Sequence, residues 1–217
     1  KRLGGVEGER GGTRLKKPAA AKRRSQRITL DGSRAPTLHQ QLDQRNRELR
    51  ELQEQQAATS KVLEVISSSR GDLAPVFQTV LESAVRVCGA KFGNLWLREG
   101  DAFRIGAMHG APAAYAEMHR REPLTRAVPG TALARAAATR KAVQIADVRK
   151  EKGYGGTGPL HTGPIKLAGA RTVFAVPVVK DDDLIGVIIV YRQEVRPFTD
   201  KQIDLVKNFA AQAAIAI

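Results

Sequence analysis

The longest regular pattern in the chain is a polar stretch in which leucines recur at heptad spacing. No glycine or proline occurs between Leu38 and Ser67, and the residues there favour a helix. With Leu42 at heptad position a, six of the nine a and d positions are apolar, namely Leu38, Leu42, Leu49, Leu52, Leu63 and Ile66. This 3.5-residue period predicts a parallel coiled-coil dimer. A single amphipathic helix that packs on its own domain is the alternative.

The pattern changes after the helix-breaking stretch "SSSRGDLAP". Asp72 as N-cap and Pro75 in the first turn predict a second helix that runs to about Cys88. Beyond it, "FGNLWLRE" and "AFRIGAMH" predict one hairpin, and "RTVFAVPVV" and "LIGVIIVYR" predict another across "KDDD". Between the hairpins we expect a short helix after Gly130, a strand at "AVQIADV", and an irregular glycine-rich region over 149–169.

The chain ends on a well-started helix. Thr199 and Gln202 have capping-box spacing, Phe198 and Ile203 have hydrophobic-staple spacing, and apolar residues then run to the last position without a stop signal. Because the first residue is not Met, we expect the chain to be a segment of a longer protein. The order helix, helix, hairpin, mixed middle, strand, hairpin, helix predicts an α+β fold with an antiparallel sheet flanked by helices.

Composition then limits the function classes. The chain has 217 residues, 42% of them hydrophobic, which fits one domain with extensions. Its net charge is +14, but residues 1–36 alone hold eleven Lys/Arg against three acidic residues. This basic tail lacks the apolar residues for a core, so we expect a disordered, solvated linker. Nonspecific contact with nucleic acid or an anionic membrane is the alternative, although the tail has no aromatic residues for base stacking.

Two absences add to this picture. No apolar run approaches the ~18 residues that span a bilayer, so no membrane span is expected. The single cysteine excludes an internal disulfide and favours a reducing compartment, the cytoplasm.

Three stretches resemble GAF domains, in particular those of bacterial sensor histidine kinases. They are "GDLAPVFQTVLESAVRVCGAKFGNLWL", "GARTVFAVPVVKDDDLIGVIIVYR" and "RPFTDKQIDLVKNFAAQAAIAI". The resemblance divides the chain into a tail (1–36), a signalling coiled-coil helix (37–68) and a GAF domain (60–217). It implies a sheet of five or six antiparallel strands, with the first and last helices on one face and a ligand pocket on the other.

The resemblance also implies how such a domain would signal. The last helix would continue into a downstream kinase or other output domain, and entry and exit helices would pair in a homodimer. Ala213 and Ile217 would then join the heptad leucines at the dimer interface.

Local motifs predict no catalytic or metal site. The glycines of "GYGGTGPLHTGPIK" lack P-loop spacing, the four histidines are scattered, and one cysteine cannot complete a structural zinc site. Cys88 is expected to be an inert core residue, with a redox sensor as the minority interpretation. The family's patterns for cyclic nucleotides and for bilins are not visible, so the ligand and any cofactor stay unidentified.

Pocket candidates follow from the layout. They are Trp96, Met108, His109, Tyr115, Arg121, Thr131, Tyr154, His161 and Arg171. Thr131 opens the short helix, whose N-terminus favours an anion. Trp96 could instead be structural core.

Three functions are compatible with these observations. The first is a non-catalytic sensor module that binds a small molecule and relays its state through dimeric helices. The second is a structural dimerisation module without a ligand. The third is an enzyme related to the free methionine sulfoxide reductases, which the single cysteine disfavours.

Overall fold

A computed structural model describes residues 38–68, 73–156 and 159–216. The tail over 1–36, the expected N-cap Asp72 and the final Ile217 lie outside the described residues. The elements are α1 (Leu38–Ser68), α2 (Leu73–Val87), β1 (Phe92–Glu99), β2 (Ala102–His109), α3 (Ala113–Arg121), β3 (Leu124–Arg126), α4 (Ala132–Thr139), β4 (Val143–Ile145), the 3-10 turns η1 (Val148–Lys150) and η2 (Lys152–Tyr154), α5 (Pro159–Lys166), β5 (Thr172–Lys180), β6 (Asp183–Arg192) and α6 (Asp200–Ala216).

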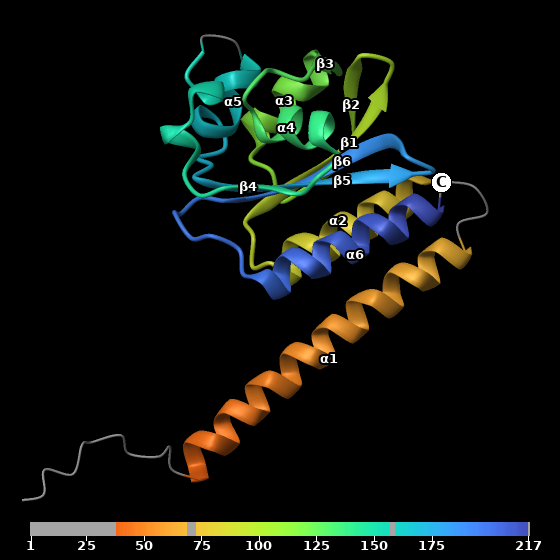
Figure 1. Cartoon of the computed structure of the whole chain (residues 1–217), viewed down its shortest axis with the longest axis vertical. Helices are drawn as coiled ribbons and strands as arrows, with labels where there is room; N and C mark the ends of the chain where they lie inside the picture. Colours follow the sequence, from red (N-terminus) through yellow and green to blue (C-terminus); the bar gives the residue numbers. More distant parts are fainter. Residues whose placement is uncertain (1–37, 69–72, 157–158, 217) are drawn as a thin grey trace, which may run out of the picture.

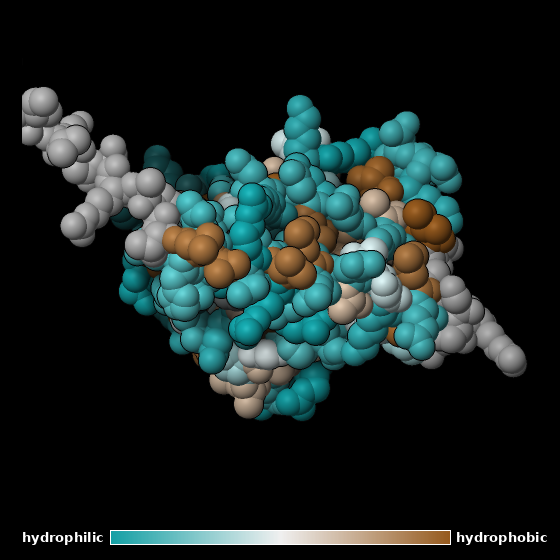
Figure 2. All heavy atoms as spheres, turned by 90° about the horizontal axis from the view of Figure 1, so that it is seen from below, coloured by the Kyte–Doolittle hydropathy of each residue, from teal (hydrophilic) through white to brown (hydrophobic). Residues whose placement is uncertain are grey.

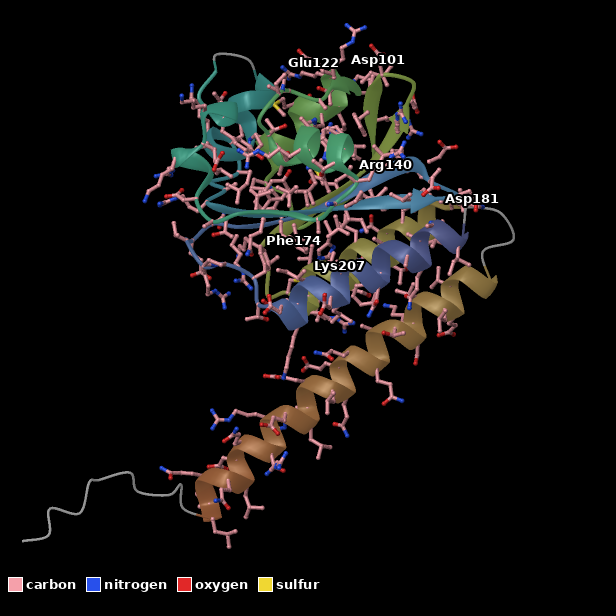
Figure 3. All side chains as sticks on the ribbon, viewed as in Figure 1. Asp101, Glu122, Arg140, Phe174, Asp181 and Lys207 are labelled. Carbon is pink, nitrogen blue, oxygen red and sulfur yellow. The ribbon has the colours of Figure 1, made fainter. Side chains whose placement is uncertain are left out.

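The strands form one six-stranded sheet in the order β3-β2-β1-β6-β5-β4. All neighbours are antiparallel, which confirms the predicted sheet and both hairpins. Asp181 and Asp182, at the turn between β5 and β6, have positive φ angles of 49° and 66°. Figure 3 labels Asp181 at this turn. The acidic run is thus a hairpin turn, as its composition predicts.

Helices cover the two faces of the sheet differently (Figure 1). α2 and α6 lie side by side on one face, with α1 outside them, whereas α3, α4 and α5 lie on the other. Strand β6 shows the division, since Ile188 and Val190 pack on the α2/α6 side while Val187 and Tyr191 pack on the opposite side. This is the layering that the GAF resemblance implies.

The start of α6 has the predicted capping box. The backbone N–H of Thr199 donates to Gln202 Oε1 at 3.1 Å, and the backbone N–H of Gln202 donates to Thr199 Oγ1 at 3.4 Å. Two N–H groups that a helix start leaves without helical partners are therefore satisfied locally.

The region over 149–169 is more regular than predicted. It contains η1, η2 and the helix α5. Pro159 stands at the first position of α5, where a proline costs little, but Gly163 and Pro164 within it disfavour a helix. Gly163 packs closely on Met118, since a Cβ built there would lie 2.9 Å from the sulfur. Tertiary packing therefore outweighs local propensity.

A buried arginine joins the sheet to the helices on its α2/α6 side. Arg192, at the end of β6, is 2% exposed. Its guanidinium donates to the carbonyls of Arg196 (2.7 Å), Pro197 (3.0 Å) and Cys88, and to Gln202 Oε1 (3.2 Å). It therefore ties together the end of α2, the end of β6 and the start of α6.

Candidate functional site

A cavity of about 40 Å³ is lined by residues of the sheet and of α3, α4 and α5, and therefore lies between these two layers. Its aromatic and polar lining comes from elements far apart in the sequence: Trp96, Tyr115, His119, Thr125, Arg126, Thr131, Tyr154 and Tyr191. Met118, Val128, Leu133, Pro164 and Ile189 complete the lining. The space is much smaller than the ~300–1,000 Å³ of drug-sized ligand sites. It therefore fits only a few non-hydrogen atoms in this conformation.

Tyrosine hydroxyls organise one side of the cavity. Asn94 Nδ2 donates to the hydroxyl of Tyr115 at 3.0 Å, deep in the core. Burial raises the pKa of Tyr115 to about 12 and the pKa of Tyr191 well above its ordinary value. Both phenols are therefore neutral near pH 7 and serve as fixed hydrogen-bonding groups.

The N-terminus of α4, where an anion was expected, is occupied by the chain's own hydroxyls. Thr131 Oγ1 accepts from the N–H of Ala134 at 3.3 Å, and the Tyr154 hydroxyl accepts from the N–H of Ala132 at 3.1 Å. Burial raises the pKa of Tyr154 to about 12, so that phenol is neutral. The helix start is capped internally and presents fewer free N–H groups than the sequence implies.

Three further polar groups in the cavity wall have no hydrogen-bond partner within the described part of the chain. They are Trp96 Nε1, His119 Nε2 and Thr125 Oγ1. The ring of His119 contacts those of Trp96 and Tyr115 edge-on, with centroids 5.1 and 4.7 Å away. Burial lowers the pKa of His119 to about 4, so the imidazole is neutral near pH 7.

The structure brings four of the nine sequence-predicted pocket residues together, namely Trp96, Tyr115, Thr131 and Tyr154. Trp96 is both a core residue and a cavity residue, because it is 4% exposed and also lines the cavity. Met108 packs against the core on this side without lining the cavity. His161 lies in α5, and its side chain is outside the described part of the structure.

His109 lies on the opposite side of the sheet from the cavity. Its Nδ1 is 3.7 Å from Glu82 of α2. A bulge explains the difference, because Leu95 pairs with Ala107 while Trp96 pairs with Ile105, which leaves Gly106 as an extra residue. The extra residue reverses the alternation of side chains that follows it.

Two predicted arginines are used elsewhere. Arg121 is exposed and its Nε lies 2.8 Å from Glu117 of the same helix. Arg171 binds Asp147 through two hydrogen bonds of 3.0 and 2.9 Å, and this pairing lowers the pKa of Asp147 to about 2. The pair fixes the connection that follows β4. Neither arginine lines the cavity.

Sequence reasoning missed His119, Thr125 and Tyr191 as cavity residues. His119 follows Tyr115 by four positions, which places both on one face of α3. Tyr191 follows Ile189 by two positions in β6 and therefore shares its face of the sheet. The sequence shows both spacings, but only the fold shows which face of α3 and which face of β6 line the cavity.

The thiol of Cys88 is expected to resist alkylation in the folded protein. The side chain is fully buried on the α2/α6 side, away from the cavity, and burial raises its pKa to about 12. Because only the thiolate reacts, a pKa raised by about three units lowers the rate of reaction with iodoacetamide roughly a thousandfold at pH 8. Mass spectrometry of alkylated chains, folded and in urea, measures this ratio. Equal rates would show a reactive thiol and revive the redox interpretation.

In the part of the chain that the structure describes, no three His, Cys, Asp or Glu side chains come together as a metal site. Among the same residues, no helix has the length and apolar character that crossing a bilayer requires.

The fold and the site define a class: an α+β domain with α1, α2 and α6 on one face of an antiparallel sheet and a small, partly open cavity on the other. The family model for the GAF domain matches residues 71–217, more than half of the chain. The chain therefore belongs to the GAF domain family. GAF domains are regulatory sensor modules of signalling proteins such as kinases and chemotaxis proteins, and they are generally not catalytic.

Solved structures share this fold. A GAF/HD domain protein from Geobacter sulfurreducens is 19% identical with a TM-score of 0.58, over 69% of this chain and 94% of that one. Residues 122 to 287 of a methyl-accepting chemotaxis protein are 21% identical with a TM-score of 0.57, over 73% and 93%. A domain assigned to a two-component sensor histidine kinase of Sinorhizobium meliloti 1021 is 15% identical with a TM-score of 0.50, over 65% and 87%. No match was found among curated proteins.

Proposed function

We propose that this chain is the sensor module of a cytoplasmic signalling protein, with a histidine kinase as the output. A small molecule bound in the cavity would shift the arrangement of α1 and α6, and a homodimer would pass that shift to the output domain. The observation that carries the proposal is the placement of the cavity and of the two terminal helices on opposite faces of one sheet. The proposed domain spans 60–217, with the helix over 37–68 leading into it.

Two different faces of α1 support the dimer. Its second half packs on the domain through Ala58 and Val62, which are fully buried, and Val65, which is partly buried. These residues occupy heptad positions c and g. The a and d leucines point elsewhere and are exposed: Leu38, Leu42, Leu49, Leu52 and Leu63. Packing on its own domain and pairing with a second α1 are therefore compatible.

On the face that Figure 2 shows, several separate hydrophobic patches lie among hydrophilic residues. A groove between α1 and α6, lined by Leu52, Leu205 and neighbouring polar residues, lies beside the leucine positions. A second copy of α1 is the proposed occupant, because heptad leucines require a helix with the same repeat.

At the C-terminal end of α6, the residue that a partner could contact is not the one that the sequence predicts. Ala213 is fully buried in the chain's own core, because it lies on the same face of α6 as Phe209 and Val206. It is therefore not available to a partner. Ile215 is 78% exposed and is the residue of this turn that a partner helix could cover. The side chain of Ile66 lies outside the described ones.

Replacing Leu49 and Leu52 together by glutamine is expected to weaken the dimer about a hundredfold or more, since each change removes a buried leucine from both chains. Sedimentation equilibrium of the full chain measures the dissociation constant, and a dimer at tens of micromolar is expected. Arg47 and Arg50, on outer positions of the same helix, give the matched control, and their replacement by glutamine should leave the constant within about threefold. A monomeric parent chain at these concentrations would overturn the relay through a dimer.

A structural dimerisation module without a ligand is the alternative, and the small size of the cavity favours it. Native mass spectrometry of the purified chain distinguishes the two. Additional non-covalent mass on the dimer supports a sensor. Bare dimers that also fail to bind any added small molecule support the structural module.

Thiol chemistry in the cavity is not supported. The chain has one cysteine, and Cys88 is buried on the other side of the sheet. An enzyme of the methionine sulfoxide reductase type would need cysteine thiols at the site, so the regulatory function is the better fit.

A further inference from the structure

Three buried polar atoms without partners belong to side chains that line one cavity. Among the residues that the structure describes, six buried side-chain atoms lack a hydrogen-bond partner, and three of them belong to the cavity wall: Trp96 Nε1, His119 Nε2 and Thr125 Oγ1. Buried polar groups in folded proteins nearly always have a partner, in the protein or in a bound molecule. Three such atoms on side chains that line one cavity are the observation from which we infer a polar ligand.

The charge around the cavity selects an uncharged molecule. Among the described residues that line it, there is no aspartate, glutamate or lysine. Arg126 lines the mouth, but its side chain is 81% exposed and pairs with Asp101 at 2.8 Å. His119 and the three tyrosines are neutral because burial disfavours their charged forms. A buried ligand cation would therefore lack a counter-charge, and a buried anion would have only the solvated Arg126, which already pairs with Asp101.

The hydrogen-bonding chemistry of the three atoms favours a ligand that carries an acceptor next to a donor. The indole N–H of Trp96 only donates, so the ligand must present an acceptor to it. The hydroxyl of Thr125 donates or accepts, and a neutral imidazole does either, depending on its tautomer. The indole and imidazole ring centroids are 5.1 Å apart. An amide group carries a carbonyl acceptor and an N–H donor on the same carbon.

The size of the cavity limits the bound group to a few atoms. A water molecule needs about 10–15 Å³ of such volume, so a cavity of about 40 Å³ has room for about three water-sized groups. A primary amide or the edge of a lactam ring has this size.

We propose that the cavity binds an uncharged amide or lactam group, with its carbonyl on the Trp96 indole N–H and its N–H on His119 or Thr125. This inference rests on the proposed function, because it names the ligand class of the proposed sensory cavity.

Three nearly isosteric probes test the class: acetamide, acetate and acetamidinium, which are neutral, anionic and cationic at pH 7. Each is titrated into the full chain at constant ionic strength. Trp96 is the single tryptophan of the chain, so its indole N–H gives one signal in a proton–nitrogen NMR spectrum. We expect a saturable shift with acetamide and at least tenfold weaker responses with both ions.

Thr125→Val, which replaces the hydroxyl by a methyl group of similar size, is expected to weaken acetamide binding about fivefold or more. Thr139→Val, the same change at an exposed position of α4, should leave it unchanged. Saturation by either ion at concentrations similar to acetamide overturns the ligand class. A lack of saturation with all three probes shows that the cavity holds only water and overturns the inference as well.

Failure of this inference is distinguishable from failure of the proposed function. The dimer measured by sedimentation and any ligand that co-purifies with the chain are independent of the three probes. A dimer that carries a charged ligand, for example, would refute the amide class and preserve the sensor.

Discussion

Replacing Arg192 by alanine is expected to lower the free energy of unfolding by about 3–5 kcal/mol, the largest effect of any single change considered for this chain. The guanidinium is 2% exposed and donates to three backbone carbonyls and to Gln202 Oε1. It also lies over the ring of Phe198, with the guanidinium carbon 4.1 Å from the ring centroid. Alanine would remove the guanidinium donor from the carbonyls of Arg196 and Pro197 and leave a void beside that ring.

Urea unfolding at equilibrium measures this loss, followed by the fluorescence of Trp96 and by circular dichroism. Arg196→Ala is the matched control, because Arg196 is exposed and its main ion pair, with Glu194, is solvated. Its effect should stay within about 0.5 kcal/mol. A loss below about 1 kcal/mol for Arg192→Ala would show that the junction is not held by this side chain.

The position of Arg192 also gives the proposed relay a short route. Tyr191 lines the cavity, and the next residue in β6 points to the opposite face, where it contacts the start of α6. A ligand that shifts Tyr191 would therefore act one residue away from the exit helix. The short distance along the chain between Tyr191 and Arg192 supports the proposed relay. A folded Arg192→Met variant would test whether the cavity is coupled to α6 through this side chain.

Much of the fold could be predicted from the sequence because its signals are local. The capping box at Thr199, the acidic turn at Asp181 and the period-2 runs that flank it each act through neighbouring residues. Helix α5 could not be predicted in the same way. Its Gly163 and Pro164 disfavour a helix locally, and packing against Met118 supplies the stabilisation.

The cavity was predictable only in part, because its lining depends on which face each residue reaches. Strict alternation along β2 would place His109 on the same side as Phe103, but the bulge at Gly106 reverses the side chains that follow. A bulge has no reliable signature in one sequence. Prediction is limited in the same way for helices. The apolar stripe of α6 includes Ala213, but the sequence does not show whether the same chain or a partner covers that stripe.

Acidification from pH 7 to pH 4 is expected to cost the folded protein about 3 kcal/mol through His119 alone. Burial lowers the pKa of this imidazole from its ordinary value of 6.5 to about 4. Between these two values the unfolded chain binds a proton that the folded chain does not, so stability falls as the pH falls through this window. A difference of about 2.5 pKa units corresponds to roughly 3 kcal/mol.

Urea midpoints of the parent chain and of His119→Phe, measured at several pH values from 7 to 4, isolate this contribution. Phenylalanine keeps a ring against Trp96 and Tyr115 but cannot bind a proton. His109→Phe is the control, because it replaces a partly exposed histidine on the other side of the sheet, away from the cavity. The ion pair of Asp147 does not interfere, because its carboxyl, with a pKa of about 2, loses its contribution only below about pH 4.

A parent chain that loses stability in this window, beside a His119→Phe variant that loses much less, would show that the folded protein holds the imidazole neutral. The amide proposal depends on that state, because a protonated imidazole only donates and would favour an anion in the cavity. Equal slopes for the two proteins would mean that His119 is protonated without cost. They would then redirect the search toward ligands that carry a negative charge.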